Sequence, residues 1–349
     1  PSVTKLSVVM SVYNGEAFIN DAIGYILAQT YRDFEFIIIN DGSTDGTLAI
    51  MQEHAVKDAR IRIIDQENTG LTLALRRGIE ASTGEYIARM DVDDISHPQR
   101  FEKQMALIDA NPELVAVTTD VQHYSLQGPK PDFSSLDRDP RLLPMLLSFF
   151  NALGGHGQVI FSRKAYDAAG GYNPNFRYSQ DYDLWTRLVE LGPFGSVREA
   201  LYNRLSDHDH ISTRFKFEQG AYSQANQRAQ YKKIMGREVD ASTADALWQY
   251  TRRIAPEKTT IAQSWRVTSL MLQGVRIFFR DNPDLAKEKF ESLRWFAAVW
   301  WWRLKEFSTI SPLLRLAFLV CVVRWGCAAL AARAVHGTSD FDGAARGVE

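Results

Sequence analysis

Short apolar runs alternate with segments of helical periodicity along the first third of the chain. Four runs have the length of a buried strand: residues 6–12, 34–39, 61–64 and 85–90. Between them, apolar residues recur at helical spacing in three segments: 17–29, 47–55 and 71–82. Buried strands that alternate with helices are typical of an α/β fold with a mostly parallel sheet. The pattern therefore predicts a Rossmann-like sheet flanked by helices.

A polar turn follows each of the four expected strands. The turns comprise residues 13–15, 40–46, 68–70 and 91–94. In open parallel sheets ligands bind at the carboxyl ends of the strands, so we expect these turns to share one ligand-binding edge. Gly, Asn, Asp and Ser also form turns and helix caps without a ligand, which is the alternative for each turn taken singly. No Gly-x-Gly-x-x-Gly follows a strand, which argues against a dinucleotide site.

The fourth turn is the most acidic of the set. Asp91, Asp93 and Asp94 place three carboxylates within four residues, where like charges repel and raise each other's pKa. A divalent cation would turn this repulsion into attraction, because Mg²⁺ is held by one or two carboxylates together with substrate phosphate oxygens. The sequence therefore predicts a metal site here, with a solvated acidic turn as the alternative.

The next stretch of the chain loses the regular alternation. Five prolines interrupt residues 111–153, which we interpret as the crossover between two halves of a domain. A short strand at 159–161 and a helix at 163–169 follow. The helix predicted for 180–190 carries Asp181 in its first turn, where a carboxylate either suits the helix dipole or serves a reaction.

After residue 213 the sequence changes to helical segments. We assign residues 1–212 to one α/β domain, 213–336 to a helical region and 337–349 to a disordered tail. Residues 295–335 combine tryptophans with arginines and lysines, a composition suited to a bilayer interface. The longest apolar run, 316–323, is far shorter than the ~20 residues of a membrane span, so docking in the membrane plane is predicted. A helical bundle or a homo-oligomer interface would bury the same residues.

Composition and charge exclude several classes of protein. The net charge of −2 and the isoelectric point near 6.5 argue against a nucleic-acid partner. The two cysteines, Cys321 and Cys327, provide neither a disulfide framework nor a Cys/His zinc site, so a reducing, cytoplasmic setting is expected. Residues 1–5 show neither the apolar core nor the cleavage site of a signal peptide, which agrees with that setting.

Five segments of the chain carry a resemblance to a known family. They are residues 8–14 (Val-Val-Met-Ser-Val-Tyr-Asn), 40–45 (Asn-Asp-Gly-Ser-Thr-Asp), 68–71 (Asn-Thr-Gly-Leu), 84–94 with its Arg-Met-Asp-Val-Asp-Asp run, and 170–185 with Gly-Gly-Tyr and Gln-Asp-Tyr-Asp-Leu-Trp. In this order they resemble the inverting glycosyltransferases of family 2, over roughly residues 5–212. The resemblance implies a GT-A fold, followed here by a C-terminal α-helical region. Ser11 stands where the family usually has proline.

On the donor side, the resemblance implies a nucleotide site and a metal site. The nucleotide would be bound by residues at the strand ends: Ser11, Tyr13, Asn14, Asp41, Asn68 and Asp91. Mg²⁺ or Mn²⁺ on the diphosphate would be held by Asp93 and Asp91, with His208 as a further ligand and His210 in reserve. The metal would offset charge on the leaving nucleoside diphosphate.

On the acceptor side, the resemblance implies that Asp181 is the general base that removes a proton from the acceptor hydroxyl. The acceptor would be contacted by Gly171, Tyr172, Gln180 and His156. For His156, a histidine satisfied within the core is the alternative.

The resulting hypothesis is a metal-dependent, inverting glycosyltransferase that moves one sugar from a nucleotide-sugar, with UDP- and GDP-sugars as first candidates. Its acceptor would be a glycan or a polyprenyl-linked glycan in cell-surface polysaccharide biosynthesis, at the inner face of a bacterial inner membrane. Processive synthases carry Gln-x-x-Arg-Trp beyond the base, whereas Glu291 precedes Arg294-Trp295 here, so single-sugar transfer is favoured. Two alternatives are a nucleotide-sugar-binding scaffold without catalysis and a sugar nucleotidyltransferase.

Overall fold

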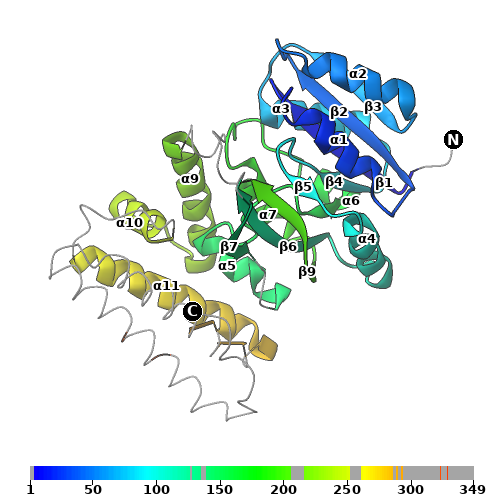
Figure 1. The fold of residues 1–349 in the computed structure, drawn as a ribbon. Coiled ribbons are helices and arrows are strands. Elements are labelled where there is room, and N and C mark those ends of the chain that lie inside the picture. The colour runs from blue at the N-terminus through cyan, green and yellow to red at the C-terminus, as the bar shows by residue number, and fades with distance from the viewer. Residues whose placement is uncertain are drawn as a thin grey trace. The chain divides into compact units, whose positions relative to one another are not determined.

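The computed structural model describes residues 4–125, 128–134, 139–205, 216–251, 261–285, 288–289, 292–293, 323 and 328 (Figure 1). These residues fall into two compact units. The first is drawn from residues 1–147 and 151–226, and the second from residues 148–150 and 227–349.

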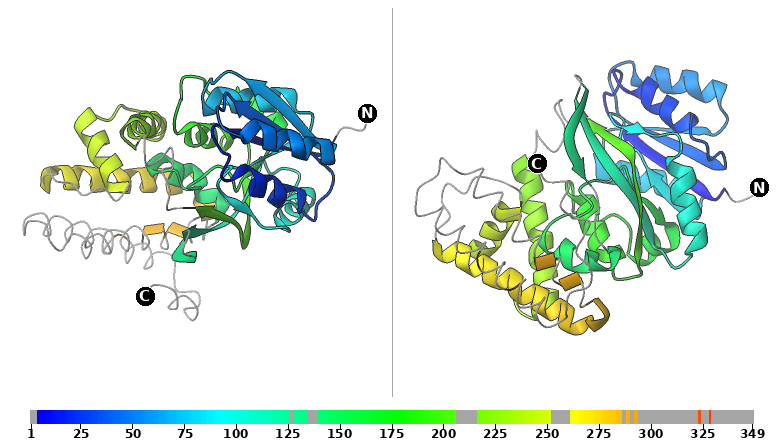
Figure 2. Two further views of the ribbon diagram at one scale, coloured as in Figure 1. Left: turned by 45° about the horizontal axis from the view of Figure 1, so that its top comes forward. Right: turned by 60° about the horizontal axis from the view of Figure 1, so that its bottom comes forward.

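A nine-stranded sheet forms the centre of the first unit, in the order β3-β2-β1-β4-β8-β6-β9-β5, with β7 paired to β6. The strands are β1 (Leu6–Val12), β2 (Phe34–Asp41), β3 (Ile61–Gln66), β4 (Tyr86–Arg89), β5 (Ile95–Ser96), β6 (Ala116–Ser125), β7 (Gly128–Ser134), β8 (Ile160–Ser162) and β9 (Phe194–Leu205). Strands β1 to β4 are parallel, as the alternation of strands and helices predicts. Beyond β4 the sheet is mixed, because β8 is antiparallel to both β4 and β6. The α/β fold is thus confirmed (Figure 2).

Helices cover both faces of the sheet because successive side chains of a strand point to opposite sides. Val8 and Met10 face a core that includes residues of α1 (Ile19–Leu27), α2 (Thr47–Lys57) and α4 (Arg100–Ala110). The other face is covered by α3 (Leu71–Ala81), α6 (Arg163–Ala168) and α7 (Gln180–Leu188). Here α3 approaches the sheet closely: a Cβ at Gly78 would lie only 2.8 Å from a methyl carbon of Val9.

Residues 111–153 contain more structure than the proline-rich pattern indicates. They include the central strand β6, its partner β7, a short 3₁₀ turn (Pro140–Leu142) and α5 (Leu143–Phe149). The prolines of β7 are tolerated because, among the strands that the structure describes, β7 pairs with β6 only, and a strand at the margin of a sheet can spare backbone donors. Strand β9 was also not predicted, since its middle carries polar and charged residues.

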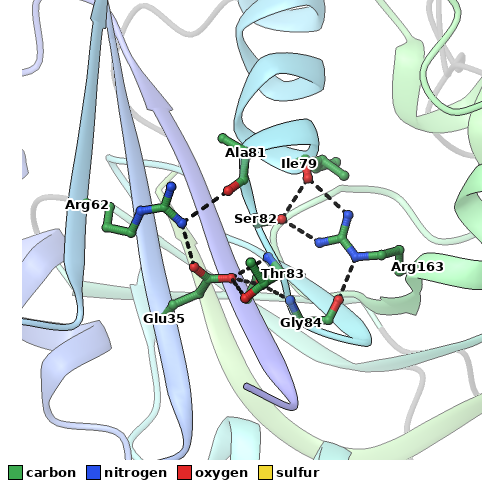
Figure 3. Close-up of polar contacts among 9 residues, drawn as sticks. Glu35, Arg62, Ile79, Ala81, Ser82, Thr83, Gly84 and Arg163 are labelled. Carbon is green, nitrogen blue, oxygen red and sulfur yellow. Dashed lines mark hydrogen bonds and ion pairs between the residues drawn. The ribbon is translucent and has the colours of Figure 1, made fainter. Parts of the chain in front are cut away.

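At the amino ends of the parallel strands, Glu35 accepts a set of hydrogen bonds (Figure 3). Its carboxylate accepts from the Ser7 hydroxyl at 2.7 Å, the Thr83 amide at 2.5 Å and an Arg62 Nη1 at 3.0 Å. Burial alone would raise the pKa of Glu35, but these hydrogen bonds outweigh burial and lower the pKa below its ordinary value. The network joins β1, β2 and β3 to the turn that precedes β4.

Arg163 makes a second set of hydrogen bonds at the same edge of the sheet (Figure 3). Its guanidinium donates to the Gly84 carbonyl at 2.6 Å, the Ile79 carbonyl at 3.0 Å and the Ser82 hydroxyl at 2.6 Å. The last turn of α3 and the start of β4 are thereby fixed to each other.

The described part of the second unit is helical, as predicted for the C-terminal region. It contains α10 (Ala241–Thr251), α11 (Ile261–Asp281), a 3₁₀ turn (Pro283–Leu285) and the end of α9 (Lys216–Met235), within which the boundary between the units falls. Among the residues that the structure describes, no helix has the length and hydropathy needed to cross a bilayer. The predicted membrane-docking stretch 295–335, apart from residues 323 and 328, and the predicted tail 337–349 lie outside the described residues.

Candidate functional site

The loops that follow β1 and β2 are joined by hydrogen bonds. The Ser43 hydroxyl accepts from the Asn14 amide at 3.0 Å, and the Asn14 side-chain oxygen accepts from the Thr44 amide at 2.8 Å. One residue further, Thr47 Oγ1 accepts from the Gly15 amide at 2.9 Å. Asn14 adopts a φ of 50°, a left-handed conformation that asparagine tolerates better than most residues. The two loops therefore form one braced unit at the carboxyl edge.

Asp41 fixes the next loop, between β3 and α3. Its buried carboxylate accepts from the Thr69 amide at 2.9 Å, the Gly70 amide at 2.9 Å and Gln66 Nε2 at 2.7 Å. The sequence assigned Asp41 to the nucleotide alone. In the structure it also holds in place the loop that would lie beside such a ligand.

Three further predicted nucleotide residues lie in this loop or near the end of β1. Asn68 lies against Gly42, whose φ of 77° and contact leave no room for a side chain: a Cβ there would be 2.6 Å from the Asn68 amide nitrogen. Tyr13 is 55% exposed at the end of β1, and Ser11 is half-buried. The structure thus brings Ser11, Tyr13, Asn14, Asp41 and Asn68 to one edge of the sheet.

The acidic turn after β4 lies at the same edge. Asp91 is paired with the buried Arg89 and its side chain is 35% exposed. Asp94 is buried and accepts from the Tyr202 hydroxyl at 2.8 Å and the Leu205 amide at 3.0 Å. Burial and the charge of Asp93 raise the pKa of Asp94 to about 7. The carboxyl group of Asp94 is therefore protonated more readily than that of an exposed aspartate.

A buried arginine, Arg100, hydrogen-bonds to the backbone that leads into this turn. Arg100 donates to the Arg89 carbonyl at 2.9 Å and to Gln104 Oε1 at 3.1 Å. Its guanidinium carbon lies 5.0 Å from the centre of the Tyr202 ring, and burial lowers the pKa of Arg100 to about 10. Tyr202, which bonds Asp94 and also lies 3.3 Å from the Asp91 amide, connects β9 to the acidic turn.

The acidic turn fits a divalent cation of the kind that shares its coordination with a substrate. Mg²⁺ is commonly held by one or two carboxylates plus phosphate oxygens, rather than by a closed protein cage. Asp91 and Asp93 are half-buried carboxylates of one turn, which is the ligand type and number that this kind of coordination uses. No cluster of three His, Cys, Asp or Glu ligands occurs among the described residues, and His208 and His210 lie outside them.

The loop before α7 is held by α3. Arg76 donates to the Tyr172 carbonyl at 2.5 Å, and Thr72 Oγ1 donates to the Phe176 carbonyl at 2.7 Å. Gly171 has a φ of 69° and packs against the Tyr166 ring, where a Cβ would come within 2.9 Å of the ring carbon that bears the hydroxyl. Because α3 begins directly after the loop that Asp41 holds, one helix positions both sides of the candidate site.

Asp181 lies in the first turn of α7, as predicted. Asn151 Nδ2 donates to one of its carboxylate oxygens at 3.0 Å. Gln180 and Asp183 are buried on either side of it, and Asp183 is paired with Arg187. Burial raises the pKa of Asp183, while the bond and ion pair with Arg187 act in the opposite direction.

His156 is placed in the interior. Its side chain is 6% exposed, contacts the Tyr172 hydroxyl, and lies edge-on to the Trp185 ring at a centroid distance of 5.7 Å. Burial, followed by the charge of Arg89, lowers the pKa of His156 well below its ordinary value. This environment favours the core-histidine alternative, and Tyr172, also predicted to contact the acceptor, is fully buried beside it.

Three residues that support the site were given no role from the sequence: Tyr202, Arg89 and Arg100. Arg89 sits inside the acidic motif and could have been noted as a counter-charge. Tyr202 lies more than a hundred residues from Asp94 in the chain, and no local pattern connects the two.

Comparisons with known proteins agree with this geometry. The profile of "Glycosyl transferase family 2" matches residues 7–170. EpsE of Bacillus subtilis, named as a glycosyltransferase, is 34% identical over 219 residues, which span 60% of this chain and 76% of EpsE. Among solved structures, S. aureus TarS 1–349 in complex with UDP-GlcNAc aligns with a TM-score of 0.58 at 14% identity, covering 95% of this chain and 92% of TarS.

A mannosyltransferase from Pyrobaculum calidifontis, solved with GDP-Man and Mn²⁺, aligns with a TM-score of 0.50 at 14% identity and covers 92% of this chain and 86% of that one. At such identities these structures show a common fold. The profile match and the identity to EpsE go further: this chain belongs to glycosyltransferase family 2.

Proposed function

We propose that the chain is an inverting glycosyltransferase that moves one sugar from a nucleotide-sugar, a UDP- or GDP-sugar first of all, to a hydroxyl group of a glycan acceptor. The observation that carries this proposal is that α3 holds two loops at one edge of the sheet. Helix α3 begins directly after the loop that Asp41 fixes, and its residues Thr72 and Arg76 hydrogen-bond to the loop that leads to Asp181. A donor site and a base are supported by one rigid element.

On the donor side, the braced loops after β1, β2 and β3 would receive the nucleoside. Tyr13 offers an exposed ring, and the carboxylate of Asp41 lies directly behind the loop that contains Asn68. Asp91 and Asp93 would hold Mg²⁺ or Mn²⁺, which as a Lewis acid offsets negative charge on the leaving diphosphate.

On the acceptor side, Asp181 would act as the general base. Its bond from Asn151 fixes the orientation of the carboxylate, and a base must lie within hydrogen-bond reach of the proton that it removes. The acceptor oxygen attacks the anomeric carbon as its proton passes to Asp181, and the nucleoside diphosphate leaves from the opposite face. A single displacement of this kind inverts the anomeric configuration.

The cellular setting extends this proposal. We place the enzyme on the cytoplasmic face of a bacterial inner membrane, where polyprenyl-linked glycans are assembled. Support comes from the composition of residues 295–335, which combine tryptophans with basic residues. The same composition would also serve a homo-oligomer interface.

The decisive experiment replaces Asp181 with asparagine. Hydrolysis of UDP-GlcNAc and GDP-mannose, with water as the acceptor, should fall by about 10²–10⁴-fold in Asp181→Asn, because a positioned base contributes on that order. The melting-temperature shift given by UDP or GDP with Mn²⁺ should match that of the unaltered chain. Asp167→Asn, an exposed carboxylate of α6, is the matched control and should retain both properties. Full hydrolysis in Asp181→Asn would remove Asp181 from the base role.

A further inference from the structure

Three aromatic side chains gather beside the loop that leads to Asp181. The ring of Phe176 lies 5.5 Å from that of Tyr222 between centroids, and the ring of Tyr178 lies 6.2 Å from Tyr222. All three side chains are half-buried, whereas Arg177 between them in sequence is exposed, with its guanidinium carbon 5.8 Å from the Tyr178 ring centre. The cluster is thus partly exposed to solvent and, along the chain, lies within a few residues of the proposed base.

The loop that carries Phe176 and Tyr178 is fixed at both ends. Thr72 Oγ1 donates to the Phe176 carbonyl, and the Ser179 hydroxyl bonds to the Gln219 carbonyl at 3.2 Å and to the Ser223 hydroxyl at 2.9 Å. Ser179 has a φ of 56°, which costs energy in a residue other than glycine and is kept only where surrounding contacts impose it. The backbone that carries the Phe176 and Tyr178 rings is therefore held in place before any ligand arrives.

Tyr222 belongs to one face of α9. Gln219, Tyr222, Ser223 and Asn226 recur at helical spacing. The Ser179 hydroxyl bonds to the Gln219 backbone carbonyl and the Ser223 hydroxyl, and the Thr186 hydroxyl bonds to the Asn226 side chain. This face is polar apart from Tyr222. A ring that only served packing would be expected among apolar neighbours in the interior, whereas Tyr222 meets two half-exposed rings.

We propose that Phe176, Tyr178 and Tyr222 form a stacking platform for a pyranose ring of the acceptor glycan, with Arg177 donating hydrogen bonds to its hydroxyl groups. The platform rests on the proposed function, since it needs a glycan acceptor whose attacking hydroxyl reaches Asp181. One face of a pyranose ring exposes C–H bonds, which are attracted to the negative face of an aromatic ring. Tyrosine suits such a surface because its body is apolar and its tip is polar, and because it loses few rotatable bonds on binding.

The test measures glycan binding apart from donor chemistry. Saturation-transfer NMR of the full chain with maltotetraose, cellotetraose and chitotetraose should show binding of at least one, because stacking tolerates different ring substituents. Tyr178→Leu and Tyr222→Leu keep apolar bulk but remove the flat ring, and each should weaken that binding by roughly threefold to tenfold. Tyr31→Leu, a half-buried tyrosine near Lys5 at the amino edge, is the control and should bind like the unaltered chain.

The outcomes separate this proposal from the proposed function. The UDP and Mn²⁺ melting shift should be unchanged in both platform variants, which also shows that they fold. Unchanged glycan affinity in Tyr178→Leu and Tyr222→Leu would overturn the platform, and so would failure of all three oligosaccharides to bind the unaltered chain. Loss of the nucleotide shift or of base dependence in the unaltered and Asp181→Asn chains would instead count against the proposed function.

Discussion

The amino and carboxyl edges of the sheet differ in how their charged side chains are stabilised. At the amino edge, Glu35 and Arg163 are satisfied by hydroxyls, backbone groups and Arg62, and the pKa of Glu35 is lowered. At the carboxyl edge, three aspartates share one turn and the pKa of Asp94 is raised to about 7. Charges at the amino edge are balanced by the fold itself. At the carboxyl edge, burial and the charge of Asp93 both disfavour the charged form of Asp94.

Removal of Arg163 should give the largest change in stability. Arg163→Met takes hydrogen bonds away from the Gly84 and Ile79 carbonyls and the Ser82 hydroxyl, so we expect a loss of about 3 kcal/mol in the free energy of unfolding. Chemical denaturation measures this value. Arg62→Met is the control, because the Arg62 side chain is about half exposed and should cost under ~1 kcal/mol. Equal losses in both variants would contradict the difference drawn between them.

Asp94 should impose a pH dependence that the amino edge lacks. Its folded pKa of about 7 lies above the ~3.9 of an unfolded aspartate, so between these values the folded chain binds more protons than the unfolded chain. Stability from this group is therefore present at low pH and lost as pH rises toward 7. In metal-free buffer, the free energy of unfolding should drop by about 2 kcal/mol more between pH 5 and pH 8 in the unaltered chain than in Asp94→Asn. Asp167→Asn should behave like the unaltered chain, and identical pH profiles in all three would refute this origin.

Asp93 should matter least for stability and most for ligand binding. Its charge contributes to the raised pKa of Asp94, so Asp93→Asn should change the free energy of unfolding at pH 7 by under ~1 kcal/mol while lowering that pKa. The added stabilisation that Mn²⁺ gives in the presence of UDP should be lost, as seen in melting temperature. A retained Mn²⁺ effect in this variant would place the cation elsewhere.

The parallel half of the fold could be predicted because each of its strands is a self-contained apolar run. The turns after those strands were assigned to one edge for the same reason, and Asp41 and Asp91 lie where that logic places them. Asp181 was expected in the first turn of a helix, and it lies there in α7. Strands β6 and β9 escaped prediction because their pairing with each other and with β8 stabilises residues whose local pattern is mixed.

The site was less completely predictable than the fold. Sequence spacing indicated which residues would lie at the edge. It did not indicate that the Asp41 carboxylate accepts hydrogen bonds from the Thr69 and Gly70 amides. The burial of His156 beneath Tyr172 likewise depends on packing between β8, α6 and α7, which no single segment records. The roles of these residues toward a substrate stay predictions.

The position of β4 bears on how the chain is made. Tyr86 pairs with Leu6 on one side and with Ser162 on the other, so the strand acquires its second neighbour only after many further residues have been added. At ~5–20 residues per second, a nascent chain carries this open edge for on the order of ten seconds. Unpaired strand edges recruit other chains, so synthesis passes through an interval in which self-association competes with folding. This interval ends when β8 pairs with β4. Asp94 gains its hydrogen-bond partners later still, because Tyr202 and Leu205 belong to β9.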